Sequence, residues 1–78
     1  MKYYLAYKDA GGRDMYPGLP WITPKDGMYI LNEARKLQNK MRHERHTYTH
    51  VTLFSCEDEE MHEKVDWDFV DAHRVPDM

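Results

Sequence analysis

Apolar and polar residues alternate near the N-terminus as they do in a β-strand. In residues 2–8, Tyr3, Leu5 and Tyr7 fall on one side of an extended chain, because successive side chains of a strand point to opposite faces. The next segment, Asp9-Ala10-Gly11-Gly12, has the composition of a tight turn. The pattern therefore predicts a first strand over residues 2–8 that ends in a turn.

A loop rich in proline and aromatic residues is predicted after this turn. Residues 13–22 contain Pro17 and Pro20, which exclude a continuous helix or a central strand. The same segment is unusually apolar, and aromatic residues are enriched in the cores of protein interfaces. We predict a protein contact through Tyr16, Leu19 and Trp21. Burial of Trp21 in the core of the domain is the alternative.

An amphipathic helix is predicted from Thr23 to Glu44. Thr23 and Asp26 can form a capping box, and Pro24 suits the first helical position. Apolar residues then recur every three or four positions, with polar residues between them. These apolar positions are Ile30, Leu31, Ala34, Leu37 and Met41.

Two further strands are predicted after the helix. Residues 48–56 are rich in β-branched and aromatic residues, and residues 65–69 alternate apolar and acidic side chains. The acidic run between them indicates an exposed turn, so these strands would form a hairpin. The predicted fold class is α+β, in which one amphipathic helix packs on a small three-stranded sheet in the order β-α-β-β. We predict a single domain over residues 1–75 and a frayed tail over residues 76–78.

Length and cysteine content narrow the class of protein. A chain of 78 residues has room for one hydrophobic core. Its lone cysteine, Cys56, has no partner within the chain for a disulfide, and no apolar run approaches the length of a membrane-spanning helix. The sequence also lacks the pattern of a signal peptide. We therefore expect a cytoplasmic protein with no membrane partner.

Charge divides the chain into a basic and an acidic part. Residues 1–56 contain nine basic and five acidic residues, whereas residues 57–78 contain two basic and nine acidic ones. Such a division is typical of a protein with separate surfaces for an acidic and a basic partner, although it also serves solubility alone. We predict that an acidic run imitates phosphates and contacts a basic protein groove. This run is Glu57, Asp58, Glu59 and Glu60.

Basic residues on the predicted helix support an alternative function. Their positive charge lies on the exposed face and at the end of the helix, where it would contact the phosphates of a nucleic acid. The candidate residues are Arg35, Lys36, Lys40, Arg42 and Arg45. An ordinary solvated helix face explains the same pattern.

Histidine and cysteine residues raise the question of a metal site. His43, His46, His50 and Cys56 are of the types that bind zinc. Structural zinc sites usually need two close pairs of ligands, which this spacing lacks, so we predict neither a metal nor another cofactor. We predict that Cys56 is a small buried hydrophobic residue and that the protein is not an enzyme. A small zinc- or thiol-dependent enzyme is the further alternative, and the convergence of the four residues stays open.

In size and element order, the chain resembles the small host-takeover and anti-defence proteins of bacteriophages, such as anti-CRISPR proteins. The elements that carry this resemblance are residues 2–8, the helix from Thr23, and residues 48–56 and 65–69. The resemblance implies a viral protein in the host cytoplasm that binds a host protein or nucleoprotein complex. It implies a non-catalytic inhibitor that blocks a polymerase or a CRISPR nuclease, and it carries over no functional residue. The oligomeric state stays open.

Overall fold

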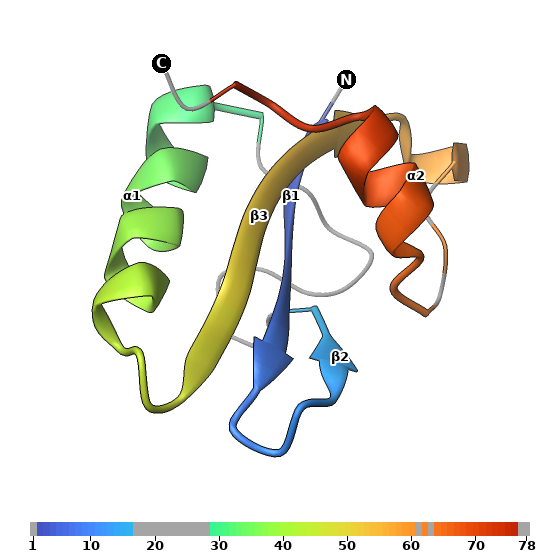
Figure 1. The fold of residues 1–78 in the computed structure, drawn as a ribbon. Helices are drawn as coiled ribbons and strands as arrows, with labels where there is room; N and C mark the ends of the chain where they lie inside the picture. Colours follow the sequence, from blue (N-terminus) through green and yellow to red (C-terminus); the bar gives the residue numbers. More distant parts are fainter. Residues whose placement is uncertain (1, 17–28, 61, 63, 77–78) are drawn as a thin grey trace.

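The computed structural model describes residues 2–16, 29–60, 62 and 64–76. It contains a three-stranded antiparallel sheet with the strand order β2-β1-β3 (Figure 1). The strands are β1 (Lys2–Asp9), β2 (Asp14–Met15) and β3 (Tyr48–Cys56). The helices are α1 (Leu31–His43), the short 3-10 helix η1 (Asp58–Glu60) and α2 (Trp67–Ala72). None of the helices in the described part of the chain is long and apolar enough to cross a membrane.

The first strand and its turn confirm the prediction. Strand β1 pairs with β3 from Lys2 opposite Cys56 onward, and it pairs with β2 at its other edge. In the turn, the Asp9 carboxylate accepts hydrogen bonds from the backbone N–H groups of Gly11 and Arg13, both at 2.9 Å. Gly12 has a φ of 80°, which a glycine adopts without steric cost. A tight hairpin therefore brings β2 alongside β1.

The main helix begins later than the sequence predicted. Helix α1 starts at Leu31, whereas Ile30 is extended, with φ −105° and ψ 114°. Ile30 is β-branched and 61% exposed, so neither its backbone preference nor burial favours a helical conformation. The predicted capping residues Thr23 to Asp26 lie outside the described residues. The predicted apolar face is confirmed from Ala34 onward, because Ala34, Leu37 and Met41 are buried.

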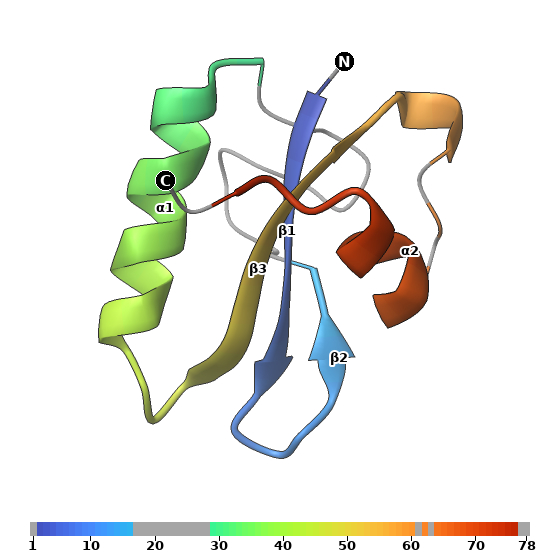
Figure 2. The same ribbon diagram turned by 45° about the horizontal axis from the view of Figure 1, so that its top comes forward.

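Both faces of the sheet carry a hydrophobic cluster. On the face covered by α1, Leu5 and Leu53 pack with the apolar side chains of the helix. On the opposite face, Tyr4 and Phe54 pack with Val70 of α2. Figure 2 shows α1 and α2 on opposite sides of the strands. The central residues of β1 and the second half of β3 are therefore covered on both faces, whereas the sequence predicted a single helix on the sheet.

The predicted third strand, residues 65–69, is wrong. These residues lead into helix α2, whose N-cap is Asp66. The Asp66 carboxylate accepts hydrogen bonds from the backbone N–H groups of Asp68 (3.1 Å) and Phe69 (3.4 Å). This cap satisfies the first turn of a helix, and helix formation buries Val70 completely against the sheet. The alternation of apolar and acidic residues was too short to exclude this helix.

The predicted element order also needs correction. Strand β2 lies in the segment predicted as loop, so the observed order is β-β-α-β followed by α2. Among the described residues, no second strand forms a hairpin with β3. Instead, residues 73–75 return to the outer edge of β3. There the backbone N–H of Ser55 donates to the His73 carbonyl (3.0 Å), and the backbone N–H of Val75 donates to the Leu53 carbonyl (2.9 Å). This return anchors the end of α2 on the sheet.

The Asp66 cap gives a direct test of helix α2. Asp66→Ala should lower the free energy of unfolding by about 1 kcal/mol, because two backbone N–H groups lose their acceptor. Asp66→Asn should change it by only a few tenths of a kcal/mol, since asparagine caps helices as well as aspartate does. Urea unfolding followed by circular dichroism measures both. Equal losses in the two variants would contradict the cap.

Candidate functional site

Strand β3 is irregular at His50. The pairing with β1 shifts between Ala6 opposite Thr52 and Lys8 opposite Thr49, so β3 contains a bulge. His50 has a φ of 57°, which is uncommon for residues other than glycine. The Thr52 hydroxyl donates to the His50 carbonyl at 3.0 Å and supports this conformation. Bulges redirect side chains, often near functional sites.

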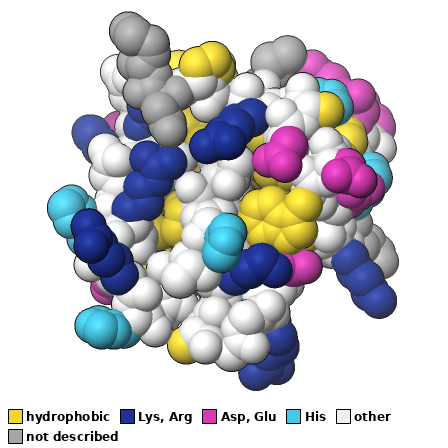
Figure 3. Space-filling model, viewed as in Figure 1, with side chains coloured by type: hydrophobic (Ala, Val, Ile, Leu, Met, Phe, Trp, Pro, Cys, Tyr) yellow, Lys and Arg dark blue, Asp and Glu magenta, His cyan; other side chains and the backbone are white. Residues whose placement is uncertain are grey.

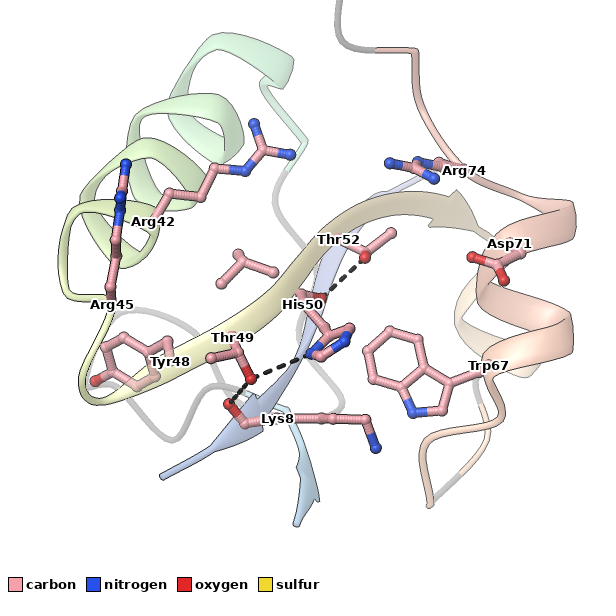
Figure 4. A pocket seen from close by; sticks show the side chains of 11 residues that line it. Lys8, Arg42, Arg45, Tyr48, Thr49, His50, Thr52, Trp67, Asp71 and Arg74 are labelled. Atoms are coloured by element: carbon pink, nitrogen blue, oxygen red, sulfur yellow. Dashed lines mark hydrogen bonds between the residues drawn. The ribbon is translucent and has the colours of Figure 1, made fainter. Parts of the chain in front are cut away.

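An open groove of about 720 Å³ lies beside this irregular part of β3. Figure 4 shows its walls, which come from the end of α1 on one side and from α2 and the segment after it on the other. Four basic side chains line it, and Asp71 is the one carboxylate among the described lining residues. The basic side chains are Lys8, Arg42, Arg45 and Arg74. The groove is therefore a site of positive charge on a protein whose net charge is −3.

The cations of the groove differ in how far neighbouring carboxylates neutralise them. The Lys8 ammonium group donates to the Asp14 carboxylate at 2.7 Å. This hydrogen bond is the main cause that holds the pKa of Asp14 below its usual range. By contrast, Arg45 and Arg74 form no ion pair with any carboxylate in the described part of the chain. Their charges are available to an anionic ligand.

Trp67 contributes a large aromatic surface to the groove. It is half-buried and lies in the first turn of α2. Its Nε1 atom is buried and has no hydrogen-bond partner of normal geometry among the described residues. The indole still lies near enough to Asp14 to help lower the pKa of that carboxyl. The Lys8 ammonium group lies 5.7 Å from the centre of the ring, within the range of a cation–π interaction.

The basic residues predicted on the helix divide between the groove and other contacts. Arg42 and Arg45 line the groove. Arg35 instead donates to the Pro76 carbonyl, and Lys36 pairs with Glu33 at 3.3 Å. Lys40 is exposed on α1 and is not among the lining residues.

Sequence reasoning missed three side chains of the groove. Lys8 belongs to a predicted strand, Trp67 belongs to the incorrectly predicted strand over residues 65–69, and Arg74 lies beyond both. No local motif marks any of the three. The spacing of Trp67 and Arg74, seven residues apart, is the one local pattern that links two of them. This spacing alone does not predict a binding site.

Tyr16 is the one residue of the predicted aromatic contact that the structure describes. Tyr16 is 9% exposed, and its ring packs 6.5 Å from that of Phe54. Burial raises the pKa of Tyr16, as expected for a core tyrosine. It is therefore a core residue and not a surface anchor, because the hairpin folds it under the sheet. Leu19 and Trp21 lie outside the described residues.

The acidic run lies beyond the end of β3. Glu57, Glu59 and Glu60 are exposed, and Asp58 begins η1. The Glu60 carboxylate accepts a hydrogen bond from the backbone N–H of Glu57 at 3.1 Å. On the face drawn in Figure 3, acidic side chains gather on the α2 side, whereas basic ones lie mainly over α1 and the groove. The charge division of the sequence is thus also a division in space.

The four candidate metal ligands do not come together. His43 and His46 are exposed at and after the end of α1, and His50 lines the groove. Cys56 is 2% exposed in the cluster under α2, which confirms that it is a buried hydrophobic residue. Among the described residues, no group of three or more histidine, cysteine or acidic side chains is arranged to hold a metal ion.

Comparison with known protein families, with curated proteins and with solved structures finds no match to this chain. The groove itself is therefore the feature from which a function can be inferred. Its chemistry is that of an open surface with guanidinium groups on two walls and a half-buried aromatic ring on the α2 wall.

Proposed function

We propose that the protein binds nucleic acid along the groove, with its basic side chains on the phosphates. The observation that carries this proposal is the convergence of arginines from two walls. Arg42 and Arg45 come from the end of α1, and Arg74 follows α2. Guanidinium groups suit this role because their planar donors match phosphate oxygens two at a time.

The size of the groove favours a polyanion over a single phosphate ion. A volume of about 720 Å³ greatly exceeds that of one phosphate group. Cations on both walls would contact successive phosphates of a strand better than they would enclose one small anion. Nucleic-acid binding is the alternative function that the basic helix predicts. Of the basic residues of that helix, the proposed site contains only those at its end, Arg42 and Arg45.

The negative net charge of the protein does not oppose this function at close range. The acidic run begins at residue 57, five residues of chain beyond Thr52 at the groove. Five residues of strand span roughly 16 Å, which is about twice the distance over which physiological salt screens charge, ~8 Å. The acidic run is therefore largely screened from the groove, where Asp71 and the Asp14 partner of Lys8 offset part of the positive charge.

Binding of labelled oligonucleotides tests the proposal. Fluorescence anisotropy should detect binding at low salt, and the affinity should fall steeply as salt increases, because phosphate contacts release counterions. Contacts with three or four phosphates predict a slope of roughly −2 to −4 in a plot of log K against log salt. Absence of binding at about 50 mM salt, or binding that does not respond to salt, would contradict the proposal.

The inhibitor hypothesis stays a prediction. It depends on the exposed acidic residues around η1 and on Leu19 and Trp21, which lie outside the described residues. It predicts the opposite result in the binding experiment: no salt-dependent binding of bare nucleic acid, and retention of a host protein complex in nuclease-treated lysate.

A further inference from the structure

We propose that the groove takes single-stranded nucleic acid and that a base of this strand stacks on Trp67. This inference rests on the proposed function and adds the class of nucleic acid. It follows from the position of the indole ring, which projects from the α2 wall into the groove, across from Arg42 and Arg45 of the other wall (Figure 4).

The structure fixes the Trp67 ring in place before any ligand binds. The Trp67 side chain packs against the hydrophobic cluster under α2, and its Nε1 edge is buried. The Asp66 cap holds the turn from which the side chain leaves the helix. A stacking surface that is already ordered loses little conformational entropy when a base binds.

The neighbourhood of the ring favours a nucleotide over an apolar ligand. Lys8 approaches the indole at 5.7 Å from the ring centre and is held there by Asp14. The His50 ring lines the same groove from the bulge in β3. A nucleotide combines a flat ring with a phosphate, so it would use the aromatic and the cationic groups together.

Stacking on the accessible part of the Trp67 ring discriminates between single and double strands. In a duplex, each base face is already covered by its neighbours, whereas a single strand can turn a base out of the stack. The groove also has basic side chains on both sides of the ring, which is the arrangement of proteins that follow a single strand. A duplex would contact the same arginines but not the face of Trp67.

The test compares three labelled probes of equal length: a thymidine strand, an abasic strand with the same phosphate backbone, and a DNA duplex. We expect the thymidine strand to bind on the order of tenfold more tightly than the abasic strand and to quench tryptophan fluorescence.

Trp67→Leu should remove this preference and leave a salt-dependent affinity like that for the abasic strand. Trp67→Phe should retain most of the preference, because phenylalanine also stacks on a base. It should lose the quenching, because the quenched fluorophore is Trp67 and the variant emits from Trp21 alone. Circular dichroism establishes that each variant is folded. If Trp67→Leu does not fold, the loss of quenching in Trp67→Phe still tests whether a base stacks on Trp67.

The outcomes separate this inference from the proposed function. Salt-dependent binding that is equal for the thymidine and abasic strands would overturn stacking and leave the proposed function in place. Quenching that persists in Trp67→Phe, or tighter binding of the duplex than of the thymidine strand, would also overturn it. Failure of all three probes to bind would overturn both proposals.

Discussion

Replacing Arg45 and Arg74 together by glutamine should weaken oligonucleotide binding by roughly 10- to 100-fold, since each loses a charge-assisted hydrogen bond to a phosphate. Both side chains line the groove, and neither forms an ion pair with a described residue. The salt dependence should fall as well, by roughly 0.7 to 0.9 in slope for each lost contact. Both residues are exposed, so the free energy of unfolding should change by less than about 0.5 kcal/mol. Anisotropy titrations at several salt concentrations measure the affinity and the slope.

The chain offers a matched control for this double variant. Arg13 and Lys36 are also basic, but they lie outside the groove and pair with Asp9 and Glu33, respectively. Arg13→Gln combined with Lys36→Gln removes the same amount of charge and should change the affinity by less than about twofold, because exposed charges away from a binding site act mainly through the overall field. Equal losses in the two double variants would show that net charge drives binding and that the groove does not.

Phe54→Ala should lower the free energy of unfolding by about 3–5 kcal/mol, the cost of a large cavity in a packed core. The Phe54 side chain is completely buried, and its ring lies 5.7 Å from that of Tyr4 and 6.3 Å from that of Phe69. Small domains lie near the low end of protein stability, at roughly 5 kcal/mol, so this variant should be largely unfolded at 37 °C. Urea unfolding monitored by near- and far-ultraviolet circular dichroism measures the loss.

A conservative and an exposed substitution bracket this result. Phe54→Leu should cost less than Phe54→Ala, because it leaves a smaller cavity. Met15→Ala should change the free energy of unfolding by less than about 0.5 kcal/mol, since Met15 is 39% exposed on a two-residue strand. A loss below about 1 kcal/mol for Phe54→Ala would contradict a packed cluster between the sheet and α2.

Local patterns predicted the first strand and the main helix. Residues 2–8 form a strand, although Tyr4 to Tyr7 are buried on both of its faces. The face of α1 that contains Ala34, Leu37 and Met41 is buried as predicted. Residues 65–69 show the opposite case, since their alternation fits a strand but α2 forms there. The deciding interaction is the burial of Val70 beneath Phe54 and Tyr4, which depends on residues far away in the sequence. A period measured over five residues contains no information on that contact.

The groove was less predictable than the fold for the same reason. Arg42 and Arg45 could be found from the basic end of the helix. Lys8 and Arg74 join them only because β1 pairs with β3 and because residues 73–75 return to the edge of β3. The left-handed backbone at His50 has no sequence signal either, since neither glycine nor asparagine occupies the position.

The pairing of β1 with β3 also determines when the chain can fold during its synthesis. Lys2 pairs with Cys56, and β1 has no other strand partner among the described residues than the two-residue β2. At ribosomal rates of ~5–20 residues per second, β1 waits roughly 2–10 s before β3 has been made. The central side chains of β1 are buried on both faces of the finished sheet. Until β3 has been made, these side chains stay exposed to chaperones and to other nascent chains. The sheet therefore assembles only after residues 48–56 have been made, and the yield of folded protein should be sensitive to conditions at that stage.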